Sequence, residues 1–276
     1  MVVAALRRPA AAPYNGAMLN LAAYLFVTID DPHALAAQLE HSAGDAGLRG
    51  TILVAEEGIN LFLAGPDAAL RAFVDALHAD PRLAALQPRY SHSASVPFAR
   101  LKVKVKPEII SFREPQATPL AQGQRAPAVD PRTVARWLAQ GGRDDAGRPV
   151  VMLDTRNTQE IEYGTFKDAL TLPISRFTEL PAALQPHRQA LAGATVVSFC
   201  TGGIRCEKAA LWMRQDGMDN VLQLDGGILG WFEQVGGQGY EGRCFVFDER
   251  VALDPQLRPL VDAMPEETLA EVTGTG

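Results

Sequence analysis

Cysteine is scarce in this sequence, and long apolar runs are missing. The chain of 276 residues has three cysteines, and an odd number with Cys200 close to Cys206 does not form the disulfide framework of a secreted protein. No Cys and His spacing typical of a zinc site is present, so we expect no metal ligand set. No stretch approaches the roughly 20 consecutive apolar residues needed to cross a bilayer, and we expect no contact with a membrane.

An excess of positive charge is also missing. Lys and Arg number 26 against 32 Asp and Glu, which gives a net charge of −6. A surface that is basic overall is therefore excluded, and contact with nucleic acid would need a local basic patch. Arg7 and Arg8 lie among alanines near the start, but the apolar run there is too short for a secretory signal. We expect residues 1–19 to be a flexible extension and the protein to be soluble and cytoplasmic.

The remaining composition is that of a globular protein, and 276 residues favour two domains. The first is expected over residues 20–112. Strand-like runs cover residues 22–29, 51–55 and 59–64, one helix begins after Asp31, and a second covers residues 66–79. A further strand is expected beside Pro88. This order predicts a ferredoxin-like (βαββαβ) α+β domain.

Residues 100–106 alternate between basic and apolar side chains. In an extended strand the basic side chains lie on one face and the apolar ones on the other. We call the four basic residues the basic stripe: Arg100, Lys102, Lys104 and Lys106. Lysines on a solvated edge strand protect it from aggregation, which would explain the stripe without a ligand. A binding site for an anion or an RNA backbone is the alternative, and the pattern alone does not decide between them.

The second half of the chain alternates between strands and helices. Residues 113–128 have the composition of a linker, and the second domain is expected over residues 129–240, followed by a C-terminal extension over residues 241–276. Helices are predicted at residues 130–139, 157–163, 180–191, 205–217 and 228–235, and strands at residues 150–153, 169–172, 194–199 and 221–224. This alternation predicts an α/β domain with a central parallel sheet, in which ligands bind at the carboxyl ends of strands.

One such strand end carries a cysteine in a glycine-rich loop. The loop consists of Cys200, Thr201, Gly202, Gly203, Ile204 and Arg205. Its two glycines allow successive N–H groups to point at one spot, and the helix that follows adds the partial positive charge of its N-terminus. Such surroundings stabilise a thiolate and lower a cysteine pKa to roughly 3.5 to 7.5. A purely structural cysteine would not need this turn, so Cys200 is the candidate catalytic residue.

The loop resembles that of the rhodanese superfamily, in which a catalytic cysteine ends a strand and a six-position loop surrounds its persulfide. The segments at residues 154–156, 162–169 and 224–231 resemble the flanking signatures of that superfamily, with Thr165 in place of a histidine. The resemblance implies a rhodanese-like α/β domain with Cys200 as its catalytic cysteine. Related cell-cycle phosphatases have one more residue in the loop, so six positions favour an adduct the size of sulfur over phosphate.

Several neighbours of the loop have two interpretations. Cys206 either forms a resolving disulfide with Cys200 or is a small residue that faces the core. Asp154 and Arg156 either hold the loop through a hydrogen-bonded pair or touch substrate. We expect a structural role for Cys244. Glu207 and Lys208 flank the loop and are expected on a solvated helix face.

The span from Tyr24 to Val251 resembles a narrower family, the rhodanese-domain tRNA uridine(34) 5-hydroxylases, in which a ferredoxin-like domain precedes the rhodanese domain. Four blocks carry this resemblance, at residues 50–60, 101–110, 200–209 and 245–250. Some members continue into a long cysteine-rich tail, whereas about 26 residues follow Arg250 here. If that tail binds RNA in those members, the basic stripe is the best candidate for RNA binding in this chain.

The resemblance implies oxygen-dependent 5-hydroxylation of the wobble uridine of tRNA, with tRNA as partner and molecular oxygen as co-substrate. Cys200 would act by attack on the pyrimidine ring or through an oxidised sulfur. No cofactor motif is recognisable, whether a facial metal triad, a flavin fingerprint or a nicotinamide loop. The alternative is a sulfurtransferase that moves sulfur through a Cys200 persulfide from a small donor, thiosulfate or a persulfide, to a thiol or cyanide. A non-enzymatic RNA-binding or scaffold protein, which would tolerate loss of the Cys200 thiol, is the third interpretation.

Overall fold

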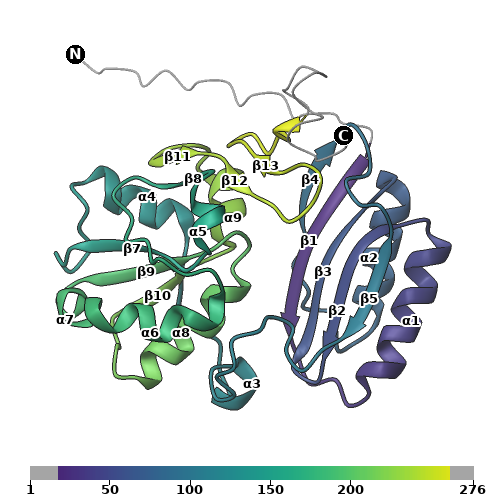
Figure 1. Ribbon diagram of the computed structural model, residues 1–276, viewed down its shortest axis with the longest axis horizontal. Helices are drawn as coiled ribbons and strands as arrows, with labels where there is room; N and C mark the ends of the chain where they lie inside the picture. The colour runs from purple at the N-terminus through teal and green to yellow at the C-terminus, as the bar shows by residue number, and fades with distance from the viewer. Residues whose placement is uncertain (1–17, 262–276) are drawn as a thin grey trace.

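The computed structural model of this chain describes residues 18–261, and Figure 1 shows two sheets, each with its own helices. The predicted flexible extension, residues 1–19, lies outside the described residues except for Met18 and Leu19, which belong to the first strand. Of the predicted C-terminal extension, residues 262–276 also lie outside the described part.

The first domain is a five-stranded sheet in the order β4-β1-β3-β2-β5. Strand β1 is antiparallel to β3 and β4, β2 is antiparallel to β3, and β5 is parallel to β2. The elements are β1 (Met18–Phe26), α1 (Pro32–Asp45), β2 (Arg49–Ala55), β3 (Gly58–Gly65), α2 (Asp67–Ala79), β4 (Arg89–Ser93) and β5 (Leu101–Val105). The βαββαβ order is confirmed, with β5 added at the edge.

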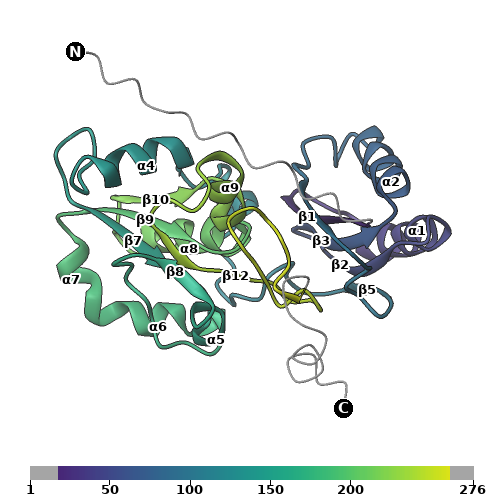
Figure 2. The same cartoon turned by 90° about the horizontal axis from the view of Figure 1, so that it is seen from above.

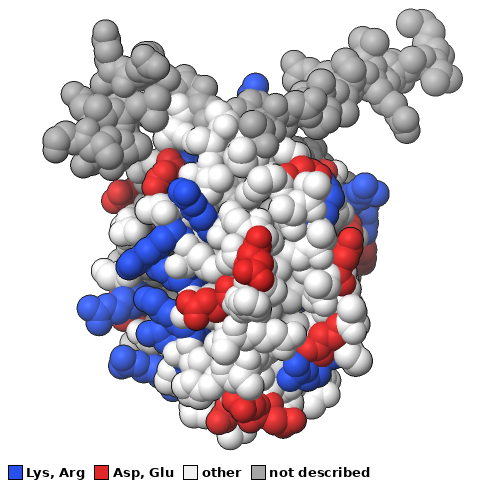
Figure 3. Space-filling view, turned by 90° about the vertical axis from the view of Figure 1, so that its right-hand side faces the viewer, with Lys and Arg blue, Asp and Glu red and all other residues white. Residues whose placement is uncertain are grey.

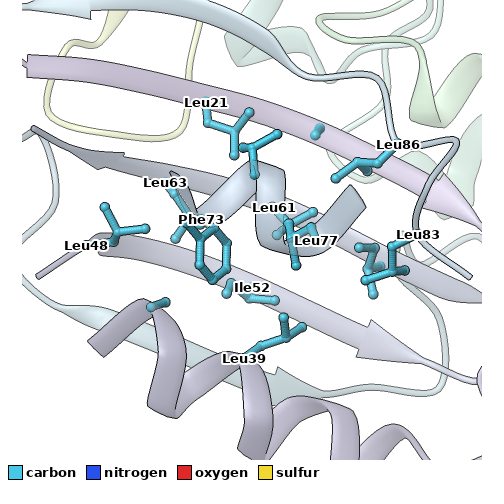
Figure 4. Packing of buried hydrophobic residues seen from close by; sticks show 14 of the residues in the cluster. Leu21, Leu39, Leu48, Ile52, Leu61, Leu63, Phe73, Leu77, Leu83 and Leu86 are labelled. Carbon is cyan, nitrogen blue, oxygen red and sulfur yellow. The ribbon is translucent and has the colours of Figure 1, made fainter. Parts of the chain in front are cut away.

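Helices α1 and α2 cover one face of this sheet, on the right of Figure 1. Leu39 of α1 and Phe73 of α2 pack there against Ile52 and Leu61 of the sheet (Figure 4). Alternate residues of β1, β2 and β3 supply this core, so the other side chains of the same strands point away from the helices. That second face of the sheet is turned toward the second domain.

The second domain has a four-stranded sheet in the order β6-β10-β9-β7, and its parallel strands confirm the predicted central parallel sheet. Its principal elements are β6 (Ala128–Val129), α4 (Pro131–Ala139), β7 (Val150–Asp154), α5 (Thr158–Ile161), α6 (Leu180–Leu184), α7 (Arg188–Leu191), β9 (Thr195–Phe199), α8 (Ile204–Gln215), β10 (Val221–Leu224) and α9 (Gly227–Gln234). Val196 and Val197 of β9 belong to cores on opposite faces of the sheet. Helices α4 and α9 cover one face and α6, α7 and α8 the other (Figures 1 and 2).

Short elements complete the chain. They are α3 (Pro119–Gln122), β8 (Gly164–Phe166), the 3-10 turns η1 (Phe177–Glu179) and η2 (Gln185–His187), β11 (Tyr240–Gly242), β12 (Cys244–Phe245) and β13 (Ala252–Leu253). Residues 113–128 include α3, and Ala117 and Ala126 are buried in the core of the second domain. The C-terminal segment crosses back to the first domain (Figures 1 and 2), where the guanidinium of Arg250 donates to Ser91 Oγ at 2.7 Å.

Three predicted elements differ from the structure. The first strand runs from Met18 to Phe26 rather than over residues 22–29, because it pairs along the whole of β3. Residues 169–172 form no strand, and Leu170 makes an isolated bridge to Leu153. The helix predicted over residues 180–191 is divided into α6, η2 and α7, since Pro186 has no N–H to donate within a continuous helix.

Candidate active site

Hydrogen bonds within the loop and from the start of α9 hold the loop that begins at Cys200. The Gly203 N–H donates to Cys200 Sγ at 3.2 Å, and Gly203 has a φ of 103°, which favours glycine. The first N–H groups of α9 point at the same loop, because the Ile228 N–H donates to the Cys200 carbonyl at 2.9 Å. Gly227 makes this approach possible, since a Cβ there would lie 2.4 Å from the Cys200 carbonyl oxygen. The loop is therefore a rigid part of the fold.

The surroundings of Cys200 favour the thiolate. Burial is the largest influence and raises the pKa of this thiol, but four others lower it: a hydrogen bond from the Cys206 side chain, the charge of Arg205, and the backbone N–H groups of Cys206 and Gly203. Together they lower the pKa of Cys200 to about 6. At neutral pH the sulfur is then mostly deprotonated and is a competent nucleophile.

Arg205 ends the loop and points inward. Its guanidinium donates to both carboxylate oxygens of Glu160, at 2.5 and 2.7 Å, and both side chains are buried. Glu160 also accepts the N–H of Asn157 at the start of α5. Removal of one partner from a buried ion pair is strongly destabilising, so Glu160 keeps the Arg205 guanidinium in place. The charge of Arg205 in turn stabilises the Cys200 thiolate.

Asp154 and Arg156 form a second buried ion pair behind the loop. The Arg156 guanidinium donates to Asp154 Oδ2 at 2.6 Å and to the Gly164 carbonyl at 2.7 Å. Thr165 donates its hydroxyl to the same carboxylate at 2.7 Å. Both charged side chains are fully buried, which favours the interpretation that the pair holds the loop over the one that it touches substrate. The threonine that replaces the family's histidine thus contacts Asp154 rather than the cysteine.

The other two cysteines are also buried near the loop. Cys206 lies in the first turn of α8, and its sulfur is 3.6 Å from the hydroxyl oxygen of Thr155. Burial and the neighbouring Cys200 raise its pKa well above the usual value. Burial raises the pKa of Cys244 to about 12. Both are therefore neutral thiols when Cys200 is a thiolate.

A cleft of about 880 Å³ separates the two domains, and Cys200 and Thr201 lie on its wall. The opposite wall is the uncovered face of the first sheet, with Tyr24 of β1 and Phe62 of β3 among its side chains. This volume lies within the range of about 300 to 1,000 Å³ for ligand pockets. The candidate site therefore needs both domains.

Tyr24 reaches across to the cysteine loop. Its hydroxyl donates to Glu207 Oε2 at 3.1 Å, and Arg125 donates to both oxygens of the same carboxylate at 2.6 and 2.7 Å. A Cβ at Gly203 would lie 3.1 Å from the Tyr24 hydroxyl oxygen. Burial, followed by the charge of Glu207, raises the pKa of Tyr24 well above its usual value, so the phenol keeps its proton.

The prediction of a solvated face for Glu207 and Lys208 is wrong. Both side chains are buried, because the first turn of α8 packs against the first domain. The Lys208 ammonium donates to Glu57 at 2.7 Å and to Glu108 at 2.8 Å. Two carboxylates of the first domain, Glu57 and Glu108, thus bind one cation of the second, Lys208. This cluster joins the two domains beside the cysteine loop.

The basic stripe lies on the cleft side of β5. Leu101, Val103 and Val105 pack against the core beneath the helices, and the lysines between them are exposed. Lys102 pairs with Thr51 and Lys104 with Leu53, both of which line the cleft. Figure 3 shows basic side chains gathered along the edge of the first domain where β5 lies, on the left of the view. Within residues 18–261 no carboxylate forms an ion pair with Arg100 or with the lysines of the stripe.

No metal site accompanies these groups in the part of the chain that the structure describes. There, no cluster of three or more His, Cys, Asp or Glu side chains is arranged to hold a metal ion. Among the same residues no helix has the length and apolar character to cross a membrane.

Comparison with known proteins agrees with both halves of this architecture. The family described as UPF0176 acylphosphatase like domain matches residues 18–109, and the Rhodanese-like domain family matches residues 134–234. A protein of Xanthomonas euvesicatoria named tRNA uridine(34) hydroxylase is 67% identical over 246 residues, which cover 89% of this chain and 98% of the relative. This chain belongs to the tRNA uridine(34) hydroxylase family.

Other members of the tRNA uridine(34) hydroxylase family have similar identity. A relative of that name from Xanthomonas campestris is 68% identical over 243 residues, covering 88% of this chain and 95% of the relative. One from Xylella fastidiosa is 64% identical over 245 residues, covering 89% and 94%. The alignments span both domains, so the resemblance stated from the sequence is confirmed.

Sequence reasoning missed several residues at the site of this hydroxylase family member. Glu160 is the partner of Arg205, and Tyr24 and Arg125 meet at Glu207. Their contacts join residues that are distant in the sequence, and no local pattern reports them. Glu160 alone had a signal, because a glutamate three positions after Asn157 is typical of a helix start.

Proposed function

We propose that this chain hydroxylates C5 of the wobble uridine of tRNA, with Cys200 as the nucleophile and dioxygen as the source of the oxygen atom. The observation that carries the proposal is a cysteine with a pKa of about 6 on the wall of a cleft between two domains, in a chain 67% identical to a protein named tRNA uridine(34) hydroxylase. The cleft is large enough for a nucleoside that has left its stack.

The proposed role of the thiolate is addition to the ring. Cys200 Sγ bonds to C6 of uracil, and the electron pair of the C5=C6 bond moves to C5, where O4 stabilises the charge. Dioxygen adds to C5. A thiol reductant supplies two electrons and two protons, so that one oxygen atom leaves as water and the other stays as the hydroxyl. Loss of the C5 proton and departure of the Cys200 thiolate restore the C5=C6 bond.

The remaining residues have supporting roles in this proposal. The N–H groups of the loop and Arg205 stabilise the departing thiolate, and Asp154 and Arg156 support the loop. The basic stripe along the cleft supplies contacts to the tRNA backbone, because phosphate contacts dominate the affinity of proteins for RNA. These cations make no ion pair within the described range, which favours a role in binding over a purely structural one.

The test is mass spectrometry of tRNA nucleosides from cells that lack this protein, complemented with wild type, Cys200→Ser or Cys244→Ser. We expect 5-hydroxyuridine-derived nucleosides to be restored by wild type and by the Cys244 variant, but not by Cys200→Ser. Labelled dioxygen should place its isotope in the new hydroxyl group. Full restoration by Cys200→Ser would contradict the role of the thiolate.

A sulfurtransferase is the second candidate, and the close contact of the loop N–H with Cys200 Sγ favours it. The thiolate would displace sulfite from thiosulfate to form a persulfide, and cyanide would remove the outer sulfur as thiocyanate and regenerate the thiolate. Unchanged tRNA nucleosides together with thiocyanate formation by the purified protein would favour this reaction over hydroxylation.

A further inference from the structure

Most basic side chains that line the cleft are neutralised by a carboxylate. Four arginines have such partners: Arg89 with Glu233, Arg125 with Glu207, Arg205 with Glu160, and Arg250 with Asp248. In the range that the structure describes, Arg113 and Arg176 line the same cleft without an ion pair, and so does Lys106 of the basic stripe. An uncompensated positive charge on the wall of a cleft attracts an anion.

Arg113 and Arg176 belong to different segments, and both line the cleft. Arg113 follows Phe112, and Arg176 precedes Phe177. The rings of these two phenylalanines are stacked with their centroids 4.4 Å apart, and both are buried. The stacked pair therefore joins the two segments that carry the arginines, and both arginine side chains are exposed to solvent.

Two carboxylates close to these arginines in the sequence accept backbone N–H groups. Glu108 accepts the N–H groups of Phe112 and Arg113, at 2.9 and 3.0 Å, and also pairs with Lys208. Glu179 accepts the N–H groups of Ser175 and Arg176, at 2.8 and 3.3 Å. Each carboxylate thus fixes the backbone beside an arginine and leaves the guanidinium free. Arg113 is held in this way at a φ of 65°, which is uncommon outside glycine.

We propose that Arg113 and Arg176 form a phosphate-binding subsite on the cleft wall, which holds the RNA backbone beside the nucleotide whose base reaches Cys200. Guanidinium groups bind phosphate with two parallel hydrogen bonds, so two neighbouring arginines fix both the position and the orientation of a phosphodiester. This subsite is separate from the basic stripe on β5. That its ligand is RNA rests on the proposed function.

The test compares Arg113→Gln, Arg176→Gln and the double variant with Arg132→Gln. Arg132 is exposed, lies outside the cleft and forms no ion pair with any residue of the described range 18–261. Binding of a fluorescent anticodon stem-loop RNA is measured by anisotropy at several salt concentrations. We expect each cleft variant to lose affinity on the order of tenfold at low salt, as for one charge-assisted hydrogen bond. The slope of log affinity against log salt should fall by about 0.7 for each lost phosphate contact. Arg132→Gln should bind as wild type does.

Lysine variants sharpen the result, because Arg113→Lys and Arg176→Lys keep the charge but lose the paired hydrogen bonds. They should recover the salt slope and only part of the affinity. Equal affinity and equal slope for the double variant and wild type would overturn the subsite, and so would an equal loss in Arg132→Gln. Wild-type protein that binds the RNA through these arginines but leaves its uridine unmodified would instead overturn the proposed function and support the subsite.

Discussion

At the scale of single residues, two opposing effects set the pKa of the Cys200 thiol. Burial raises this pKa, and nearby hydrogen-bond donors and positive charge lower it. Burial alone would keep the thiol protonated and inert. The Cys206 thiol, Arg205 and two backbone N–H groups outweigh burial and lower the pKa to about 6. Arg205 can do so because Glu160 holds its guanidinium in place.

This balance predicts the pH dependence of hydroxylation. The thiolate is the folded protein's dominant form above pH 6 and is lost as the pH falls through the pKa of about 6. We expect kcat/KM for an anticodon stem-loop RNA to be constant above about pH 7 and to fall about tenfold for each pH unit below the pKa. Ultraviolet absorbance of the thiolate, measured against Cys200→Ser, should titrate with the same midpoint.

Substitutions at Cys206 provide the control. Cys206→Ala removes a donor to Cys200 and should move the midpoint to higher pH, whereas Cys206→Ser keeps a donor and should move it less. Full activity of Cys206→Ser would also exclude a resolving disulfide. A midpoint near the ordinary cysteine value of 9.0 in wild type would contradict the proposed stabilisation of the thiolate.

The sequence was enough to propose Cys200 as the catalytic residue, but most of its surroundings could not be predicted. Cys200 and Arg205 lie in one continuous loop whose glycines and following helix have a local physical meaning. Glu160, Tyr24 and Glu207 meet the loop only through tertiary contacts. The expected solvated face of α8 is wrong for the same reason, since the sequence of a helix does not tell which neighbouring domain covers it.

At the scale of elements, α8 connects the chemistry to the interface between the domains. Its first turn places Arg205 toward Glu160, Glu207 toward Tyr24 and Lys208 toward two carboxylates of the first domain. Elements with a strong periodic pattern, such as β10 over Val221–Leu224, were predicted with their bounds. The short strands β6 and β8 were not, because they consist of two or three residues and depend on pairing with distant partners.

Loss of the Lys208 cation should weaken the interface between the domains and lower the stability of the protein. Lys208→Met leaves Glu57 and Glu108 without their shared partner, and breaking a buried ion pair in this way costs about 3 kcal/mol or more. Urea unfolding should report this loss as a lower midpoint. Arg214→Met on the same helix removes a half-exposed, long ion pair and should change the stability by less than about 0.5 kcal/mol. Equal midpoints for the two variants would show that the cluster does not hold the domains together.

At the scale of the whole molecule, the net charge is −6, but the charged residues are unevenly distributed. Lys102 and Lys104 of β5 pair with Thr51 and Leu53, which line the cleft, and the Cys200 thiol lies on the opposite domain. A long polyanion could contact the whole stripe and the cleft at once, whereas a small anion such as thiosulfate is too short to do so. The ferredoxin-like domain thus has a role in the proposed reaction on tRNA that it would not have in a simple sulfurtransferase.

Reversal of charge on the basic stripe tests whether the stripe binds RNA or is only a solvated edge. Lys102 and Lys104 are exposed on an edge strand, so Lys102→Glu with Lys104→Glu should leave the fold and the reactivity of Cys200 intact. We expect the double variant to lose most of its affinity for anticodon stem-loop RNA at low salt, with a less steep dependence on salt. The control is Arg132→Glu with Lys167→Glu, which makes the same change in net charge at exposed positions outside the cleft. If both double variants bound and modified the RNA as wild type does, the stripe would be a solvated edge that only prevents aggregation. If both lost affinity equally, net charge rather than the position of the stripe would govern binding.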